Sequence, residues 1–381
     1  MELNFSIPCL FGLEGLCADE LKRMNMENVR AENGRVLFSG GKADIPRANI
    51  NIRTGERLLI VVGDVKASTF DELFEGVRAM PWEDYIPVNG EFPVKGHSLS
   101  SKLTSIPDCQ SIVKKAIVER LKSKYNVSWF EETGDKYQVQ FAIMNDIATL
   151  HIDTSGTGLH KRGYRPKGNA APLRETLAAA IVKLSRYRGK EKVCDPFCGS
   201  GTIPIEAALI AKNQAPGLYR DFAAKKWQWL EDKLWLDAVK DAKSREFSGD
   251  YDIWGGDIDP NSIKIAAENA KRAGVSDCVR FEVAEAADLY SNMSMQNADS
   301  IGSVPSNGIV MTNPPYGERV MLPREAERIY REFGKTMKNF ENWKMYILSS
   351  HTEFERTFGR TAVKKRKLYN GMIKCDLYMY Y

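Results

Sequence analysis

The sequence predicts an α/β protein with a doubly wound parallel sheet in its C-terminal half and a smaller α+β region before it. Short apolar runs alternate with helical patterns from about residue 172 onward, which is typical of strands joined by crossover helices. A short strand at 192–195 leads through a Gly-rich loop into a helix, and a second buried strand stops at Asn313-Pro314-Pro315-Tyr316. These two strand ends are the places where such a sheet would carry a site.

Length and composition are those of a globular protein with more than one domain. The chain has 381 residues, of which 43% are hydrophobic and 27% charged. The net charge of +4 permits nucleic-acid binding without arguing for it. The seven cysteines are scattered without a Cys-x-x-Cys pair, and no apolar run approaches the roughly 18 residues of a membrane span. We therefore expect a cytoplasmic protein with reduced thiols, no metal site and no membrane partner.

The first 155 residues predict short helices and strands. Apolar residues at helical spacing indicate amphipathic helices over 14–24 and 107–125. Alternating apolar residues indicate half-buried strands near 137–143 and 148–152. Glycines, prolines and basic residues between Ser155 and Gly168 are typical of a linker.

The C-terminal half predicts a regular succession of elements. Asp259 is expected to cap a helix that has Pro260 at its first position and ends at Gly274. The segment 214–250 reads as a Trp- and Lys-rich insertion that is helical in its second half, and 291–307 reads as a mobile loop. The other expected elements are helices over 172–188, 202–212 and 324–338, and strands over 192–195, 253–257, 279–283, 308–312, 343–349, 363–368 and 373–380.

The first motif is the loop that follows the strand at 192–195, with the sequence Asp195-Pro196-Phe197-Cys198-Gly199-Ser200-Gly201-Thr202. Gly199 and Gly201 let a ligand approach the backbone closely, and Asp195 can meet a positive or hydroxyl-bearing group. A dinucleotide fingerprint would need a third Gly where Pro204 stands, and the chain lacks the Gly-Lys-Ser/Thr of a phosphate-binding loop. The loop therefore favours another nucleotide-like cofactor.

The second motif is Asn313-Pro314-Pro315-Tyr316. The prolines restrict the backbone and hold Asn313 rigidly at the end of its strand. The side-chain oxygen of Asn313 and the carbonyl of Pro314 can accept the two N–H bonds of a planar amino group on a base, while Tyr316 can stack on the ring. Taken alone, Asn-Pro is also ordinary turn chemistry.

Both motifs, in this order and each at a strand end, resemble those of S-adenosylmethionine-dependent methyltransferases that act on amino groups. Over its whole length the chain resembles the THUMP-domain RNA guanine-N2 methyltransferases, in particular the RlmL-like 23S rRNA family in a form with a single methyltransferase domain. The resemblance extends to Gly158-Leu159-His160-Lys161-Arg162-Gly163-Tyr164-Arg165, Ala215-Pro216-Gly217-Leu218, Gly317-Glu318-Arg319 and Leu368-Tyr369-Asn370-Gly371.

The resemblance implies an α/β fold with a C-terminal Rossmann-like class I S-adenosylmethionine methyltransferase domain and N-terminal α+β ferredoxin-like and THUMP domains. The implied boundaries are 1–65 for the ferredoxin-like subdomain, 66–155 for the RNA-binding THUMP domain, 156–170 for the linker and 171–381 for the methyltransferase domain.

The resemblance also implies roles for individual residues. Asp257 would bond the ribose hydroxyls, with Asp259 as the rival, and Glu285 would bond the adenine, with Asp288 as the rival. The residues expected to bind S-adenosyl-L-methionine are Asp195, Pro196, Cys198, Gly199, Gly201, Thr202, Asp257, Glu285 and Asn313. The expected catalytic residues are Asn313, Pro314, Pro315 and Tyr316, and those expected to contact RNA are Arg162, Arg165, Lys167, Lys365 and Arg366.

The expected activity is transfer of a methyl group to the exocyclic N2 of a guanine in 23S rRNA, as part of rRNA processing. A tRNA substrate and a non-catalytic RNA-binding ribosome assembly factor are the alternatives. Adenine-N6 methylation of DNA would use the same Asn-Pro-Pro-Tyr chemistry, but no DNA-reading module is recognisable in the sequence. The modified nucleotide and the oligomeric state stay open.

Overall fold

The protein is described here by a computed structural model that covers residues 2–165, 173–291, 307–316, 323–340 and 342–381. These residues form two compact units. Unit 1 consists of Met1–Cys9, Ala18–Leu159 and Arg220–Asp241. Unit 2 consists of Leu10–Cys17, His160–Tyr219 and Ala242–Tyr381. In the described part of the chain, no helix is both long and apolar enough to cross a membrane.

The N-terminal elements follow the order strand, helix, strand, strand, helix, strand. They are β1 (Leu3–Pro8), α1 (Glu14–Arg23), β2 (Glu27–Glu32), β3 (Arg35–Gly40), α2 (Asp44–Asn51) and β4 (Leu59–Lys66). Neighbouring strands pair antiparallel in the order β2-β3-β1-β4. This arrangement is a ferredoxin-like fold, as expected from the sequence.

The rest of the N-terminal region adds strands to the same sheet. It comprises α3 (Phe70–Ala79), the 3-10 turn η1 (Trp82–Asp84), β5 (Val94–Leu99), α4 (Ile106–Tyr125), β6 (Val139–Met144) and β7 (Ile147–Asp153). The sheet continues from β4 in the order β7-β6-β5, with β5 parallel to β6. Thr69 and Glu72 form a capping box that starts α3, and α3 packs on α4.

Part of the insertion predicted within the methyltransferase domain belongs to unit 1 instead. The insertion contains η2 (Ala223–Lys226) and α7 (Asp232–Ser244), so its second half is helical as predicted. The Trp227 ring stacks on Tyr137 at 4.9 Å, and its indole N–H donates to the Lys136 carbonyl. The Trp229 indole donates to the Tyr85 carbonyl. The buried indole of Trp227 and the half-buried indole of Trp229, each with its N–H paired, fix this segment against the residues before the linker.

Unit 2 is built on a second sheet, of order β10-β9-β8-β11-β12-β14-β13. The strands β8 to β12 are parallel, and β14 runs antiparallel to β12 and β13. The bounds of these strands are Val193–Asp195 for β8, Ile253–Asp257 for β9, Val279–Val283 for β10, Gly308–Thr312 for β11, Trp343–Ser349 for β12, Lys364–Asn370 for β13 and Ile373–Tyr380 for β14. The expected strands of this half are all present.

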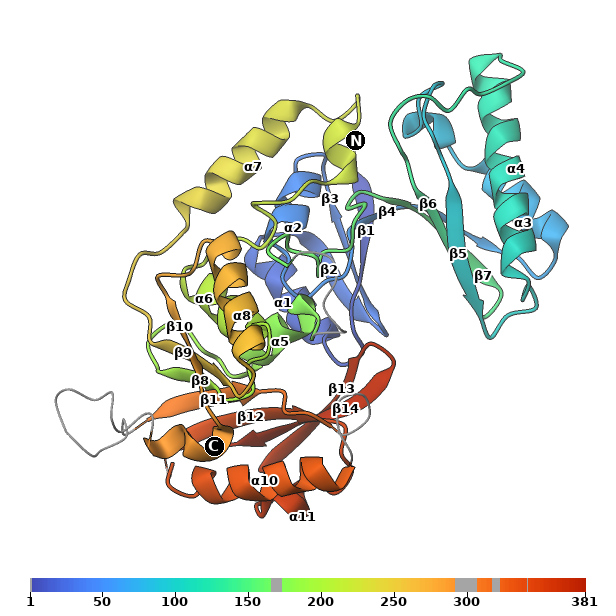
Figure 1. Cartoon of the computed structure of the whole chain (residues 1–381). Coiled ribbons are helices and arrows are strands. Elements are labelled where there is room, and N and C mark those ends of the chain that lie inside the picture. The colour runs from blue at the N-terminus through green and yellow to red at the C-terminus, as the bar shows by residue number, and fades with distance from the viewer. Residues whose placement is uncertain (1, 166–172, 292–306, 317–322, 341) are drawn as a thin grey trace. The chain divides into compact units, whose positions relative to one another are not determined.

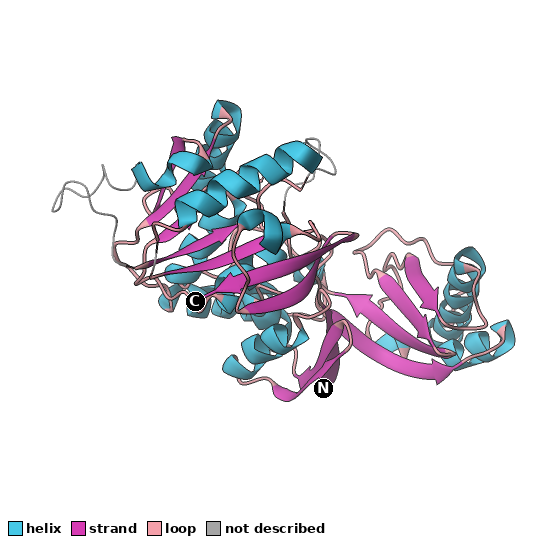
Figure 2. Ribbon diagram, turned by 90° about the horizontal axis from the view of Figure 1, so that it is seen from below, coloured by secondary structure: helices cyan, strands magenta, loops and turns pink. Residues whose placement is uncertain are grey.

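Helices cover both faces of this sheet (Figures 1 and 2). They are α5 (Glu175–Leu184), α6 (Thr202–Ala211), α8 (Pro260–Ala273), α10 (Pro323–Met337) and the short α11 (Phe354–Phe358), with the 3-10 turn η3 (Ala286–Asp288) after β10. The helix expected over 172–188 is shorter than predicted, and Arg186 just beyond its end has a positive φ of 62°. The doubly wound α/β fold expected from the sequence is confirmed.

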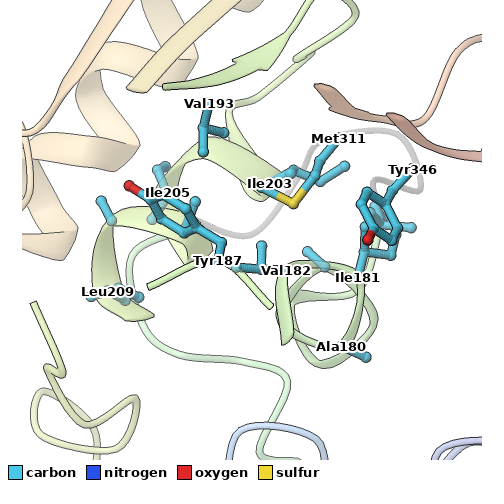
Figure 3. Close-up of a cluster of buried hydrophobic side chains, with 14 of the residues drawn as sticks. Ala180, Ile181, Val182, Tyr187, Val193, Ile203, Ile205, Leu209, Met311 and Tyr346 are labelled. Atoms are coloured by element: carbon cyan, nitrogen blue, oxygen red, sulfur yellow. The ribbon is translucent and has the colours of Figure 1, made fainter. Parts of the chain in front are cut away.

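The core on one face of the sheet is formed by α5 and α6 against the strands. Ile181 of α5 and Ile203 of α6 are buried with Val193, Met311 and Tyr346 from the strands (Figure 3). A second cluster on the other face includes Tyr330, Phe333 and Trp343. Because nearly every residue of α6 is buried, packing fixes its position, and with it the position of the loop that precedes it.

The order of the strands creates a switch point between β8 and β11. From β8 the chain proceeds outward to β9 and β10, whereas from β11 it proceeds the other way to β12. The loops after β8 and β11 therefore diverge and leave a crevice at the carboxyl edge of the sheet. Both sequence motifs lie at this edge. The expected mobile loop at 291–307 falls mainly on residues outside those described.

Candidate active site

Asp195 joins the two strands of the switch point. It ends β8 and is buried, and its Oδ1 accepts hydrogen bonds from Thr312 Oγ1 at 2.6 Å and from the Phe197 N–H at 3.2 Å. Thr312 is the last residue of β11. Burial raises the pKa of Asp195 to about 7, with the two hydrogen bonds acting in the opposite direction. This carboxyl group is therefore poised to change charge near neutral pH.

Glycine is needed at positions 199 and 201 of the loop for different structural reasons. Gly199 has φ +52°, and a Cβ there would meet nothing within 4 Å, so its backbone faces open space. Gly201 has φ +81°, and a Cβ there would lie 2.9 Å from Phe281 and 3.0 Å from Ala266. Gly199 therefore leaves room for a ligand, whereas Gly201 allows α6 to begin against its neighbours.

Asp257 fastens the end of β9 to the Gly-rich loop. Its Oδ2 accepts from the Gly199 N–H at 2.9 Å, and its Oδ1 accepts from the Asp259 N–H at 3.0 Å. Asp259 caps α8, accepting from Asn261 N–H at 3.0 Å and from Ser262 N–H at 3.1 Å, as expected. The capping role occupies the Asp259 carboxylate, while Asp257 lies between the loop and the cavity.

The Asn-Pro-Pro-Tyr segment follows β11 directly and is held by hydrogen bonds. The Tyr316 hydroxyl donates to Asn313 Oδ1, and the Pro315 carbonyl accepts from the Tyr330 hydroxyl of α10 at 2.6 Å. The side chain of Asn370 also hydrogen bonds to the Tyr316 hydroxyl. Burial raises the pKa of Tyr316 well above its ordinary value, so this side chain stays neutral.

One cavity of about 730 Å³ collects both motifs. Asp257 and the exposed Ile258 line it at the end of β9, and Glu285 lines it after β10. The predicted site residues that line the cavity are Asp195, Pro196, Cys198, Gly199, Thr202, Asp257, Glu285, Asn313, Pro314, Pro315 and Tyr316. Of the described residues predicted to bind cofactor, Gly201 does not line it. Of the two rivals, Asp259 lines the cavity beside Asp257, whereas Asp288 does not.

The polar and apolar groups that line this cavity fit a nucleoside that carries a positive charge. Carboxylates at Asp257 and Glu285 can accept from hydroxyl and amino groups, and Ile258 offers an apolar surface between them. The buried Asp195 can pair with a positive charge beside the open backbone at Gly199. The Asn313 side of the cavity offers amide and carbonyl acceptors for a second molecule.

Several cavity residues were missed by the sequence analysis. Ile258 directly follows Asp257, and an apolar side chain in a loop next to a predicted site residue could have indicated that it lines the cavity. Arg328 of α10 and the hairpin residues Asn370 and Ile373 also line the cavity. They come from segments far apart in the chain. The string Leu368-Tyr369-Asn370-Gly371, which resembles the family, was a signal for Asn370, but it pointed to no role for that residue.

The basic residues expected to contact RNA have mixed placements. Arg162 is buried and pairs with Glu206 at 3.5 Å, and Arg165 pairs with Glu175 and donates to Thr202 Oγ1 at 3.3 Å. The expected RNA contact of Arg162 is therefore wrong, because a buried side chain does not reach a phosphate. Arg165 forms an ion pair with the buried Glu175, and its expected contact with RNA stays a prediction.

The other three residues expected to contact RNA lie near the end of the chain or outside the described part. Lys365 is exposed on β13, where its ammonium is 2.7 Å from the Glu355 carboxylate. Arg366 is half-buried on the same edge strand. Lys167 lies outside the described residues.

Fold and site together define a methyltransferase of the α/β class, and family comparison gives the same class. Residues 162–379 match the family described as "RMKL-like, methyltransferase domain". Residues 4–59 match the RlmL ferredoxin-like domain, and residues 67–153 match the THUMP domain. The chain belongs to the RMKL-like methyltransferase family and carries these two domains before the catalytic one. The domain boundaries given above stay predictions.

Individual relatives extend over the whole chain. YpsC of Bacillus subtilis (strain 168) is 43% identical over 97% of this chain and 94% of its own length. The ribosomal RNA large subunit methyltransferase K/L of Psychromonas ingrahamii is 32% identical over 99% of this chain but only 50% of its own length. The chain thus spans about half of that second relative.

Solved structures of the same fold are also close. A protein from Listeria monocytogenes, described as a predicted N6-adenine-specific DNA methylase, has a TM-score of 0.92 and 44% identity, with 100% of this chain and 96% of that chain covered. SMU.472, solved as a complex with SAH, has a TM-score of 0.91 and 38% identity, with 100% and 98% covered.

Proposed function

We propose that this protein is an S-adenosyl-L-methionine-dependent RNA methyltransferase that modifies the exocyclic N2 amino group of a guanine in 23S rRNA. One observation carries the proposal: the Gly-rich loop after β8 and the Asn-Pro-Pro-Tyr segment after β11 line the same cavity. A cofactor loop and an amino-group acceptor pair are the two parts that such a transfer requires.

The β8–β10 side of the cavity is the proposed cofactor side. Asp257 and Glu285 would bond the ribose hydroxyls and the adenine amino group, and Asp195 with the open backbone at Gly199 would hold the methionine part. The SAH complex of SMU.472 supports this cofactor, because that protein shares the fold over the whole chain. When bound, S-adenosyl-L-methionine supplies an electrophilic methyl group.

The β11 side is the proposed base side. A guanine amino nitrogen is a poor nucleophile because its lone pair is delocalised into the ring. Asn313 Oδ1 and the Pro314 carbonyl would accept its two N–H bonds, favour a pyramidal nitrogen and aim the lone pair at the methyl group. Such orientation can contribute up to about 7–11 kcal/mol in ideal cases. The Tyr316 ring would stack on the base, at about 1–3 kcal/mol.

The substrate class rests on the N-terminal domains and the relatives. The THUMP domain and the rRNA methyltransferase K/L relative favour RNA, and the large-subunit rRNA in particular. A base in RNA must leave its stack to enter a cavity of this kind. The chain spans half of that relative, and the guanine-N2 transfer proposed here is assigned to the methyltransferase domain that the structure describes. A cytoplasmic location is part of the proposal.

The test is methyl transfer from tritiated S-adenosyl-L-methionine to total RNA from a strain that lacks this protein. We expect label in N2-methylguanosine of the large-subunit rRNA after nucleoside analysis of separated RNAs. Label in N2-methylguanosine of tRNA would show that tRNA is the substrate and would leave the proposed chemistry unchanged. Label as N6-methyladenosine would overturn the base assignment, and cofactor binding without label in any RNA, including ribosome assembly intermediates, would favour a non-catalytic role.

A further inference from the structure

The turn between β13 and β14 brings a second amide side chain to the cavity. β14 runs antiparallel to β12, and Asp376 near its start lies opposite Ser349 at the end of β12. The turn therefore lies at the carboxyl edge of the parallel strands, the edge that carries the loops after β8 and β11. Asn370 ends β13, pairs with Ile373 across the turn, and lines the cavity together with it.

Asn370, Tyr316 and Asn313 form a chain of hydrogen bonds along the base side of the cavity. Asn370 hydrogen bonds to the Tyr316 hydroxyl, and this hydroxyl donates to Asn313 Oδ1. Burial raises the pKa of Tyr316, whereas the Asn370 contact lowers it, as a donated amide N–H does. The Cys375 side chain on β14 is a further hydrogen-bond partner of this hydroxyl, and its contact raises the pKa of Tyr316. The three polar side chains come from two distant parts of the sequence.

The direction of these bonds determines what Asn313 can do. A tyrosine hydroxyl has one proton, so when Asn370 donates to its oxygen, that proton must go to an acceptor. It is donated to Asn313 Oδ1, a stronger acceptor than the Cys375 sulfur. Only the oxygen end of the Asn313 amide can receive it. The bond therefore distinguishes the oxygen of the amide from its nitrogen, and the second lone pair of that oxygen stays available to an amino group.

We propose that Asn370 is a positioning residue for methyl transfer, which by donating to Tyr316 directs the tyrosine proton onto Asn313 and keeps the Asn313 oxygen oriented as an acceptor for the target amino group. This inference rests on the proposed function, since it needs an amino group as the methyl acceptor. It adds a residue on the β13–β14 turn to the site, outside both sequence motifs.

The decisive variant is Asn370→Asp, which keeps the shape and replaces the donor by an acceptor. The carboxylate that this substitution introduces would draw the Tyr316 proton to itself and away from Asn313. We expect a single-turnover rate at saturating RNA and cofactor that is lower by about tenfold or more, with a smaller loss for Asn370→Ala. The affinity for SAH, measured by calorimetry, stays unchanged, because the cofactor side of the cavity is untouched.

A double-mutant cycle with Tyr316→Phe shows whether the effect passes through the hydroxyl. In the Tyr316→Phe background, Asn370→Asp should cause no further loss of rate. Lys374→Gln, on the exposed face of the same hairpin, is the control and should behave as the wild type. Equal losses from Asn370→Asp in both backgrounds, or wild-type activity of Asn370→Asp, would overturn the inference.

These outcomes separate the inference from the proposed function. If the wild type methylates an amino group on another base, the guanine assignment fails and the same cycle is measured on that product. If the wild type binds SAH and methylates no RNA, the proposed function fails on the wild-type data alone, and a role for Asn370 in methyl transfer fails with it.

Discussion

At the scale of single residues, Asn313 carries the proposed chemistry. Its side chain lines the cavity at the end of β11, and Asn313→Ala removes the acceptor oxygen without touching Asp257 or Glu285. We expect methyl transfer to fall by at least about a hundredfold, the scale seen when one preorganised polar group is removed from an active site. SAH affinity by calorimetry should match the wild type. Wild-type activity of the variant would show that Asn313 is not the acceptor for the target amino group.

Asp195 gives a prediction about protons. Its pKa of about 7 in the ligand-free protein means that it is mostly protonated at pH 6 and mostly ionised at pH 9. A cationic ligand in the same cavity favours the ionised form and lowers this pKa, so binding at pH 6 should release close to one proton and binding at pH 9 almost none. Calorimetry of S-adenosyl-L-methionine binding, in which the sulfonium is the cation, measures the number of protons released when it is repeated in buffers of different ionisation enthalpy. Asp195→Asn should abolish the difference in proton release between pH 6 and pH 9. Proton uptake on binding at pH 6 would contradict the predicted direction of the pKa change.

At the scale of elements, the segment that precedes α5 holds α6. Arg162 Nε lies 3.5 Å from Glu206 Oε1, the two side chains are 3% and 0% exposed, and the Tyr164 hydroxyl donates to the same oxygen at 3.2 Å. Arg162→Met leaves a buried carboxylate without its cation, so the free energy of unfolding should fall by about 3–5 kcal/mol. Urea unfolding at pH 7 measures this change.

The surface pair Arg356–Glu353 is a matched control for that measurement. Its charged groups are 3.0 Å apart, but the side chains are 75% and 55% exposed. Arg356→Met should therefore cost less than about 1 kcal/mol. Similar losses in the two variants would show that the buried pair does not hold α6 more firmly than a surface contact does.

Elements were also the scale at which the sequence was most informative. The strands β9, β10, β11 and β12 coincide with the predicted ranges. For β9, β11 and β12 the reason is that buried parallel strands are short apolar runs bounded by turn residues, whereas the edge strand β10 shows alternating apolar and charged residues. The loops after β8 and β11 were located for the same reason. The position of Asn370 and Ile373 in the cavity lining could not be predicted, since it depends on how the antiparallel hairpin of β13 and β14 returns to the edge of the sheet. Arg162 was misassigned because a basic residue in a Gly-rich segment gives no sign that an acid on α6 will bury it.

At the scale of the whole molecule, ligand binding should stabilise the folded protein. A ligand that binds only the folded state at 100 times its Kd adds about 2.7 kcal/mol to the free energy of unfolding. We expect SAH at such a concentration to raise the melting temperature of unit 2 by about 5 °C or more. Asn313→Ala should show the same shift and Asp257→Ala a much smaller one. An unchanged melting temperature of the wild type with SAH would contradict the proposal that the β8–β10 side of the cavity binds the cofactor.

The path of the chain between the two units limits how the protein can be divided for experiments. Residues 220–241 leave the catalytic part of the sequence, complete unit 1 through Trp227 and Trp229, and return. A fragment cut at the linker, such as 1–159, would lack the indole that stacks on Tyr137 and would present an uncovered aromatic surface prone to self-association. The complementary fragment would carry both tryptophans with nothing to bury them. Expression of an RNA-binding module from this chain therefore calls for a fused 220–241 segment, not a simple truncation.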